Sequence, residues 1–167
     1  MGLLLASVLP FSSAGAGTGS LPALGKPTGK VILTISGNLA KTNLGKAVVI
    51  DFAMLDSLPQ STVITKNPWT KGPHTYNGPL LSTVMRWVGC KGTNLVVTAL
   101  NDYVGKIPST DFKEWPVILA TRMDGHVMSI REKGPVFVVY PFDDHPQLLN
   151  EVYYCRSIWQ VKSIQIQ

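Results

Sequence analysis

Two short apolar runs in the C-terminal third of the chain show the clearest pattern in the sequence. Residues 117–120 and 136–140 are continuously hydrophobic and rich in β-branched side chains. Runs of this length and composition are typical of buried strands. A polar segment that contains the turn-forming pair Asp124-Gly125 lies between them. The pattern therefore predicts two buried strands on either side of a turn.

The remaining hydrophobic positions predict a mixture of short strands and short helices. Strands are predicted at residues 31–36, 47–50, 61–65, 95–100 and 103–107. Helices are predicted at residues 52–58, 80–88 and 108–115. Asp51 is placed to cap the first helix, Gly89 ends the second, and Asn101-Asp102 forms a hairpin turn. Residues 66–78 are predicted to form a long loop. Because strands and helices mix irregularly, we expect one compact α+β domain with a mixed sheet and short helices.

The composition fits a single folded domain and changes this picture little. The chain has 167 residues, of which 45% are hydrophobic and 15% are charged, enough for one substantial core. Its 12 prolines and 15 glycines are scattered, which favours many short elements over a helix bundle. The net charge of +5 is dispersed, without a run of Lys or Arg, so nucleic-acid binding is not indicated.

The N-terminal segment has the character of an export signal. Residues 1–16 are apolar and end in the small residues Ala14-Gly15-Ala16, where a signal cleavage site would lie. A basic n-region is missing, so a flexible tail is the alternative reading. Residues 17–29 have linker composition, which leaves residues 30–167 as the folded domain. Since no later stretch approaches the ~20 apolar residues of a membrane span, we expect a periplasmic protein if the source is bacterial.

The sequence carries no familiar metal or hydrolase motif. Cys90 and Cys155 lack zinc-ligand spacing, and a disulfide between them stays open at this stage. The histidines at positions 74, 126 and 145 share no metal-ligand spacing either. Gly-x-Ser-x-Gly does not occur, so a serine hydrolase is not indicated.

Five longer blocks occur along the chain in a fixed order. They are PWTKGPHTYNGPLLSTVMRWVG, TALNDYVGKIP, LATRMDGHVMS, KGPVFVVYPFDD and RSIWQVKSIQI. Their order resembles that of the sulfite-oxidase-type (oxidoreductase molybdopterin-binding) domain, specifically its short, single-domain, exported bacterial members. The resemblance runs from about residue 30 to the C-terminus. It implies the compact α+β fold of that family.

One departure from the family pattern decides which part of the family's chemistry we expect. The resemblance places the molybdenum-binding cysteine within residues 65–68, where this sequence reads Thr-Lys-Asn-Pro. Without that soft sulfur ligand, oxygen-transfer chemistry at a metal is disfavoured. Binding of the organic part of the cofactor, a pterin, is not affected by this departure.

A pterin site needs aromatic faces for stacking, an acceptor for the amino and ring N–H groups, and a donor for the carbonyl. The predicted loops and the C-terminal block supply such residues. The candidates for ligand binding are Trp69, Tyr76, Asn101, Asp102, Tyr103, Arg122, Asp144, Tyr154, Arg156 and Trp159.

Several of these candidates have an alternative structural role. Trp159 lies beside apolar residues and is as well suited to the core. Arg156 needs a partner, which Asp143, Asp144, Glu151 or a ligand would supply. Asp102 fits a turn, and Arg122 either faces the site or pairs with the aspartate two residues later.

Three functions remain after this reading. The first is a non-catalytic, exported protein that binds a pterin and no metal. Both an oxidised and a reduced pterin are candidates for the ligand. The resemblance implies that such a protein modulates a membrane-bound cyclic-di-GMP cyclase or phosphodiesterase through its periplasmic part. The second is a molybdopterin-dependent oxidoreductase of the sulfite oxidase type, with molybdopterin a weaker candidate than a free pterin. The third is an interaction module that binds no ligand.

Overall fold

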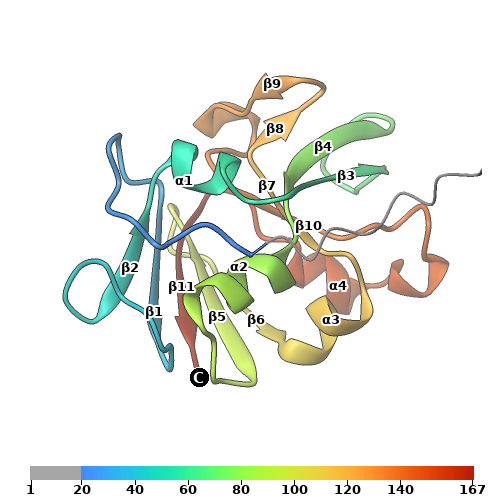
Figure 1. The fold of residues 1–167 in the computed structure, drawn as a ribbon. Helices are drawn as coiled ribbons and strands as arrows, with labels where there is room; N and C mark the ends of the chain where they lie inside the picture. The colour runs from blue at the N-terminus through green and yellow to red at the C-terminus, as the bar shows by residue number, and fades with distance from the viewer. Residues whose placement is uncertain (1–19) are drawn as a thin grey trace, which may run out of the picture.

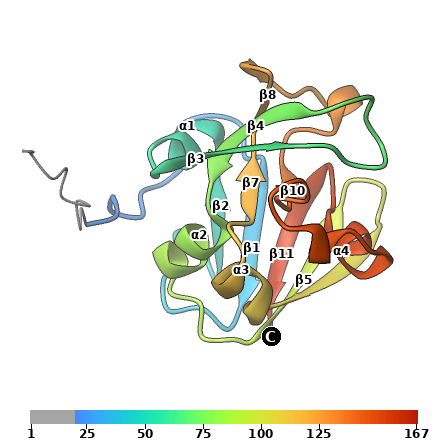
Figure 2. The ribbon, with the colours of Figure 1, turned by 90° about the vertical axis from the view of Figure 1, so that its right-hand side faces the viewer.

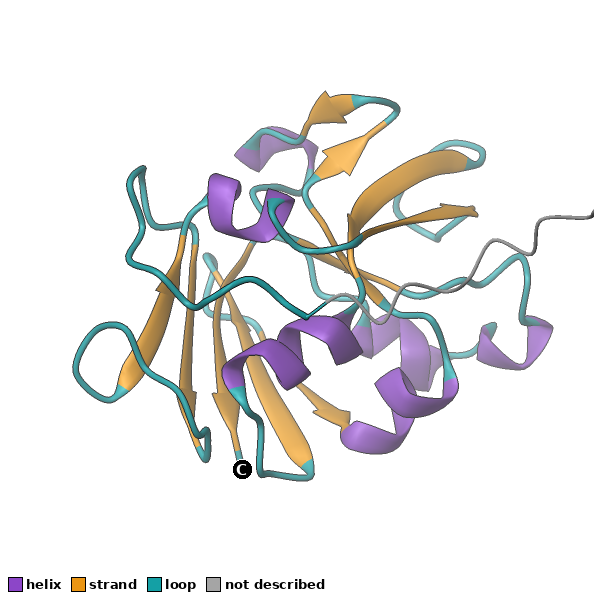
Figure 3. Cartoon of the chain, in the orientation of Figure 1, coloured by secondary structure: helices purple, strands orange, loops and turns teal. Residues whose placement is uncertain are grey.

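The computed structural model describes residues 20–167, so the predicted export signal lies outside the described residues. The strands are β1 Leu33–Gly37, β2 Ala47–Ile50, β3 Gln60–Thr65, β4 His74–Pro79, β5 Asn94–Ala99, β6 Val104–Pro108, β7 Ile118–Ala120, β8 Arg122–Met123, β9 His126–Val127, β10 Phe137–Val139 and β11 Val161–Ile166. The α-helices are α1 Phe52–Asp56, α2 Leu81–Val88, α3 Ser109–Glu114 and α4 Glu151–Arg156, with 3-10 turns at Ile130–Glu132 and Pro146–Leu148. These helices are short beside the strands (Figure 3), and within residues 20–167 none has the length and apolar character to cross a membrane.

A five-stranded sheet forms one side of the molecule (Figure 1). Its order is β2-β1-β11-β5-β6, with β1 and β11 parallel and the other pairs antiparallel, so the sheet is mixed, as predicted. Helix α2 buries six of its eight residues, and five of these, among them Trp87, belong to the core that this sheet shares. It ends at Gly89, whose left-handed φ of 69° suits glycine. The predicted helix and its stop signal are therefore confirmed.

The two apolar runs form β7 and β10, which pair antiparallel between two hydrophobic cores. Along β7, Val117 and Leu119 contribute to the core under the five-stranded sheet, whereas Ile118 and Ala120 face the second core. Strand β10 alternates in the same way. Because successive side chains of a strand point to opposite faces, a strand with two covered faces must be apolar throughout. Both predicted buried strands are confirmed, and this is their physical reason.

The second sheet has the order β3-β4-β8-β9 and corrects one prediction. Residues 74–78 were expected in a long loop, but they belong to β4, which pairs with β3 along its whole length. The glycine at position 78 hid this strand. A Cβ atom there would lie 2.0 Å from the carbonyl oxygen of Leu119, so only glycine lets β4 cross β7 this closely. The true loop is shorter and spans residues 66–73.

The segment before β1 is held against the domain. The Asp51 carboxylate accepts the backbone N–H groups of Thr28 and Gly29, each at 2.7 Å, and that of Met54 at 2.9 Å as the N-cap of α1. The Trp87 Nε1–H donates to the carbonyl of Pro22 at 2.8 Å. The N-cap prediction is confirmed, and the described part of the predicted linker is packed on the folded body.

Candidate functional site

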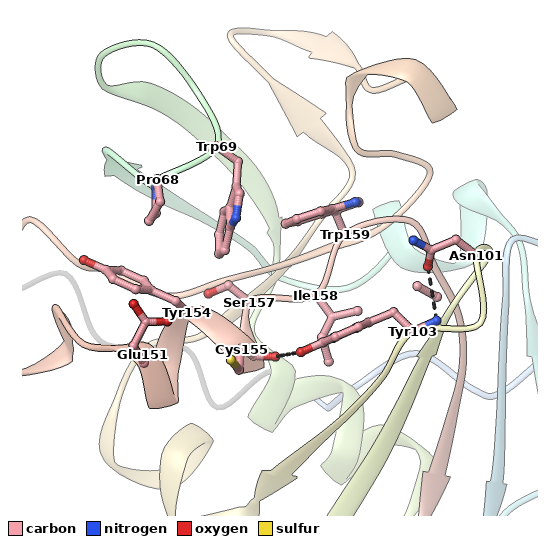
Figure 4. Close-up of a pocket in the computed structure, with 11 residues that line it drawn as sticks. Pro68, Trp69, Asn101, Tyr103, Glu151, Tyr154, Cys155, Ser157, Ile158 and Trp159 are labelled. Atoms are coloured by element: carbon pink, nitrogen blue, oxygen red, sulfur yellow. Dashed lines mark hydrogen bonds between the residues drawn. The ribbon is translucent and has the colours of Figure 1, made fainter.

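A cavity of about 480 Å³ opens between chain segments that are far apart in sequence. Its walls come from the loop after β3, the β5–β6 hairpin, α4 and the link from α4 to β11 (Figure 4). Viewed from the side, α4 lies next to β5 and β6 (Figure 2). The lining residues are Pro68, Trp69, Ala99, Asn101, Tyr103, Glu151, Tyr154, Cys155, Ser157, Ile158 and Trp159. The volume falls within the range of small-molecule sites.

Three aromatic rings contact one another in the lining of this cavity. Trp69 lies edge-on to Trp159, with ring centroids 4.9 Å apart and planes at 64°, and to Tyr154 at 6.2 Å and 80°. The loop that carries Trp69 is fixed by Asn67, whose Oδ1 accepts the Trp69 N–H at 3.1 Å and whose amide donates to the Tyr76 hydroxyl at 2.9 Å. All three rings line the cavity, so they are the surfaces on which a flat ligand would stack.

Lys133 contacts Trp159 from outside the cavity lining. Its Nζ lies 4.5 Å from the indole centroid, and burial lowers the pKa of this ammonium group. The Lys133 carbonyl also accepts the N–H of Gln160 at 2.9 Å, which ties this segment to the strand that follows Trp159. Trp159 lines the cavity and Lys133 is not among the lining residues, so the lysine contacts this wall as a cation–π partner of the indole.

Other lining residues supply hydrogen-bonding groups. The Tyr103 hydroxyl donates to the Cys155 carbonyl at 3.1 Å, which ties the β5–β6 hairpin to α4 (Figure 4). Burial raises the pKa of Tyr103, so the phenol stays a donor at neutral pH. The Asn101 Oδ1 accepts the Tyr103 N–H at 3.2 Å, which leaves its amide NH₂ to other partners. Glu151 carries the one formal charge among these lining residues, all within the described part of the chain.

The structure brings together five of the ten predicted ligand-binding residues. Trp69, Asn101, Tyr103, Tyr154 and Trp159 line the cavity. Asp102 sits in the adjacent hairpin turn with φ 64° and pairs with Lys162. Asp144 is exposed and Tyr76 is fully buried in the second core, and neither lines the cavity.

The two predicted arginines are bound to carboxylates that were not expected. Arg122 makes a two-pronged ion pair with Asp56, at 2.6 and 2.8 Å, and not with Asp124. Asp124 instead accepts from His74 at 2.6 Å and from the Thr75 N–H at 2.9 Å. Both contacts join segments about fifty or more residues apart, so no local pattern pointed to them.

Arg156 is likewise paired with none of the residues proposed for it. Its partner is Asp111 on α3, whose two oxygens lie 2.9 and 3.1 Å from the guanidinium. The Tyr140 hydroxyl donates to the same carboxylate at 2.7 Å, and burial, followed by the Asp111 charge, raises the pKa of Tyr140 well above its usual value. This network fastens α4, and with it one wall of the cavity, to the core.

The sequence analysis did not predict α4, and it therefore missed the lining residues Glu151 and Cys155 on this helix. The additional lining residues are Pro68, Ala99, Glu151, Cys155, Ser157 and Ile158. A signal for the helix was present: Asn150 is a good N-cap, and its Oδ1 accepts the Val152 N–H at 3.0 Å. With that cap recognised, helical spacing would have placed Glu151, Tyr154 and Cys155 near one another.

The segment expected to hold a metal-binding thiolate, residues 65–68, begins with Thr65 at the end of β3. This side chain is fully buried, and its hydroxyl accepts the Asp143 N–H and donates to the Lys66 carbonyl, both at 3.1 Å. Its hydrogen-bonding capacity is used within the protein. Within residues 20–167 no group of three or more His, Cys, Asp or Glu side chains could hold a metal ion. Cys90 and Cys155 are both free thiols, so they form no disulfide.

The fold has a counterpart among solved structures. No protein-family model and no curated protein matches the chain. The crystal structure of the sulfane dehydrogenase SoxCD from Paracoccus pantotrophus is similar, with a TM-score of 0.60 and 20% sequence identity. The match covers 80% of this chain and 37% of that chain, so this chain corresponds to little more than a third of the enzyme subunit. The likeness shows the α+β fold of sulfite-oxidase type.

Proposed function

We propose that this chain is an exported protein that binds a pterin in the cavity between Trp69 and α4 and runs no redox chemistry on it. The aromatic wall facing a rim of hydrogen-bonding groups is the observation that carries the proposal. Trp69, Trp159 and Tyr154 provide stacking surfaces, and Asn101 and Glu151 provide a donor and an acceptor for the edges of the heterocycle.

The absence of a thiolate at the end of β3 supports a metal-free role. Thr65 is a hard oxygen donor whose hydroxyl is already occupied by two backbone partners, so it does not replace a soft sulfur ligand. These residues therefore do not suit molybdenum, whereas the aromatic and hydrogen-bonding lining of the cavity is of the kind that a flat heterocycle needs. The likeness to a sulfane dehydrogenase keeps a molybdopterin-dependent oxidoreductase as the second candidate.

The expected partner is the periplasmic part of a membrane-bound cyclic-di-GMP cyclase or phosphodiesterase. This element of the proposal rests on the resemblance of the sequence blocks alone. It requires the loaded protein to bind the receptor with an affinity different from that of the empty protein. Titration of the receptor's periplasmic domain with loaded and empty protein measures this difference directly. Equal affinities would remove the signalling role.

The ligand itself is tested by release and by titration. Protein isolated from a native periplasm and denatured should release a fluorescent pterin without stoichiometric molybdenum. Added reduced pterin should quench the emission of Trp69 and Trp159, and Trp69→Ala should weaken binding about tenfold. Trp115→Phe, outside the cavity lining, is the matched control. Stoichiometric molybdenum would favour the oxidoreductase, and neither release nor binding would leave an interaction module.

A further inference from the structure

The charge of the cavity restricts which pterins it can accept. Glu151 is the one lining residue with a formal charge in the described part of the chain, and it is exposed at the cavity. The other lining groups are aromatic rings, aliphatic carbons, hydroxyls, an amide and a thiol. An anionic ligand would therefore meet a carboxylate and no compensating cation among the lining residues, which is unfavourable.

Three of the cations on neighbouring elements are already engaged. Arg156, next to the cavity wall, is bound to the buried Asp111 at 2.9 Å. Lys162 on β11 is paired with Asp102 in the hairpin turn. Lys133 lies over an indole and outside the lining. Recruiting any of them for a bound phosphate would mean breaking an existing contact, so none is a ready phosphate ligand.

Two further lysines, Lys66 and Lys71, lie on the loop that carries Trp69. Both are exposed and neither lines the cavity. Their attraction for a ligand at the opening is weakened by water and salt, because exposed charges in high dielectric interact weakly. They do not turn the cavity into a phosphate site.

The carboxylate that repels anions is suited to the opposite edge of a pterin. The aminopyrimidine edge of the heterocycle presents adjacent N–H donors, and a carboxylate accepts two such hydrogen bonds side by side. We propose that the cavity selects an uncharged, unphosphorylated pterin whose donor edge faces Glu151, and that it discriminates against phosphorylated pterins, molybdopterin included. This inference rests on the proposed pterin function and adds the class of ligand.

A matched pair of ligands tests the selectivity. The full-length protein is titrated, at low and at moderate ionic strength, with 6-hydroxymethyl-7,8-dihydropterin, with its diphosphate ester, and with dihydrobiopterin. The last ligand has a neutral side chain and separates the effect of size from that of charge. We expect the two neutral pterins to bind at least about tenfold more tightly than the diphosphate, with a smaller ratio at higher salt.

Two charge-reversal variants locate the origin of the selectivity. Glu151→Lys should reduce the ratio of the affinity for the neutral pterins to that for the diphosphate about tenfold or more. Glu114→Lys changes the net charge by the same amount, but it lies on an exposed part of α3 outside the cavity lining and should leave this ratio unchanged. Thermal melting shows whether both variants are folded. If Glu151→Lys is not folded, Glu151→Gln replaces it in the measurement.

Three outcomes would contradict different parts of the proposal. Equal or tighter binding of the diphosphate overturns the selectivity while pterin binding stands. The same ratio in Glu151→Lys or Glu151→Gln as in the parent overturns the role of Glu151. Failure of all three ligands to bind overturns the proposed function and this inference with it.

Discussion

Replacing Asp111 by alanine tests the network that holds α4 in place. The Asp111 side chain is 5% exposed and accepts from the Tyr140 hydroxyl and from the Arg156 guanidinium, whose side chain is 25% exposed. Removing the carboxylate leaves the fully buried Tyr140 hydroxyl without its acceptor, at a cost of about 1–3 kcal/mol. Breaking a buried ion pair costs about 3–5 kcal/mol, and less where the remaining charge reaches water, as Arg156 can.

These contributions overlap, so we expect Asp111→Ala to lower the free energy of unfolding by about 3 kcal/mol. Tyr140→Phe removes one hydrogen bond but leaves Asp111 paired with Arg156, so its expected cost is about 1 kcal/mol. Arg156→Ala leaves the nearly buried carboxylate with one neutral donor, and its cost should approach that of Asp111→Ala. The order of the three variants is a sharper test than any single value.

Urea denaturation followed by tryptophan fluorescence measures these free energies, and for a chain of this size Asp111→Ala should lower Tm by roughly 10 °C. Asp144→Ala is the control, because this aspartate is exposed and its side chain makes no hydrogen bond within the described residues. An Asp111→Ala variant no less stable than Tyr140→Phe would refute the reasoning. Because α4 lines the cavity, ligand affinity should fall in Asp111→Ala even at temperatures where the variant is folded.

Three further outcomes follow from other contacts. Hydrogen bonds to the carboxylate, of which that from Gly29 is the largest cause, lower the pKa of Asp51. The stabilisation that the carboxylate provides is therefore complete above about pH 4 and is lost as pH falls through the folded-state pKa. Asp51→Asn should be less stable than the parent protein at neutral pH, and urea titrations in acid should show a smaller difference in the free energy of unfolding. Gly78→Ala should cost about 3 kcal/mol in denaturation, since its Cβ would strike the β7 backbone; a cost under about 1 kcal/mol contradicts the close crossing. Trp87→Phe should lower the free energy of unfolding by about 1 kcal/mol more than Trp115→Phe does. The reason is that the Trp87 N–H has a hydrogen-bond partner, whereas the buried Trp115 N–H has none within the described residues. Equal shifts in Tm for the two variants would contradict this.

Much of the fold could be predicted because its signals are local. Strands β7 and β10 are apolar at every position, and α2 combines helical spacing with a glycine stop. The Asp51 cap precedes its helix directly. Strand β4 was missed because its sequence contains glycine and proline, which local rules assign to loops, whereas here glycine permits a crossing of strands.

The candidate site was half predictable for a related reason. Trp69 stood out because tryptophan is rare and this one lies outside the apolar runs, whereas Trp159 follows Ile158 and was equally suited to the core. Two of the lining residues that were missed, Glu151 and Cys155, belong to α4, a six-residue helix too short for a periodic pattern. Ion-pair partners were the least predictable feature, since the charges that meet are separated by 45 residues for Arg156 and 66 for Arg122.

Different contacts hold the two sides of the cavity in place. Trp69 lies on a loop held by Asn67, and Trp159 lies on the link from α4 to β11. Glu151, Tyr154 and Cys155 lie on α4, which is held by Asp111. A six-residue helix is not stable on its own, so its place depends on the contacts it makes at its ends. Asn150 fixes the first turn and Arg156 the last. Substitutions at Asp111 should therefore alter ligand binding without touching the ligand, whereas those at Trp69 should alter binding with little change in stability.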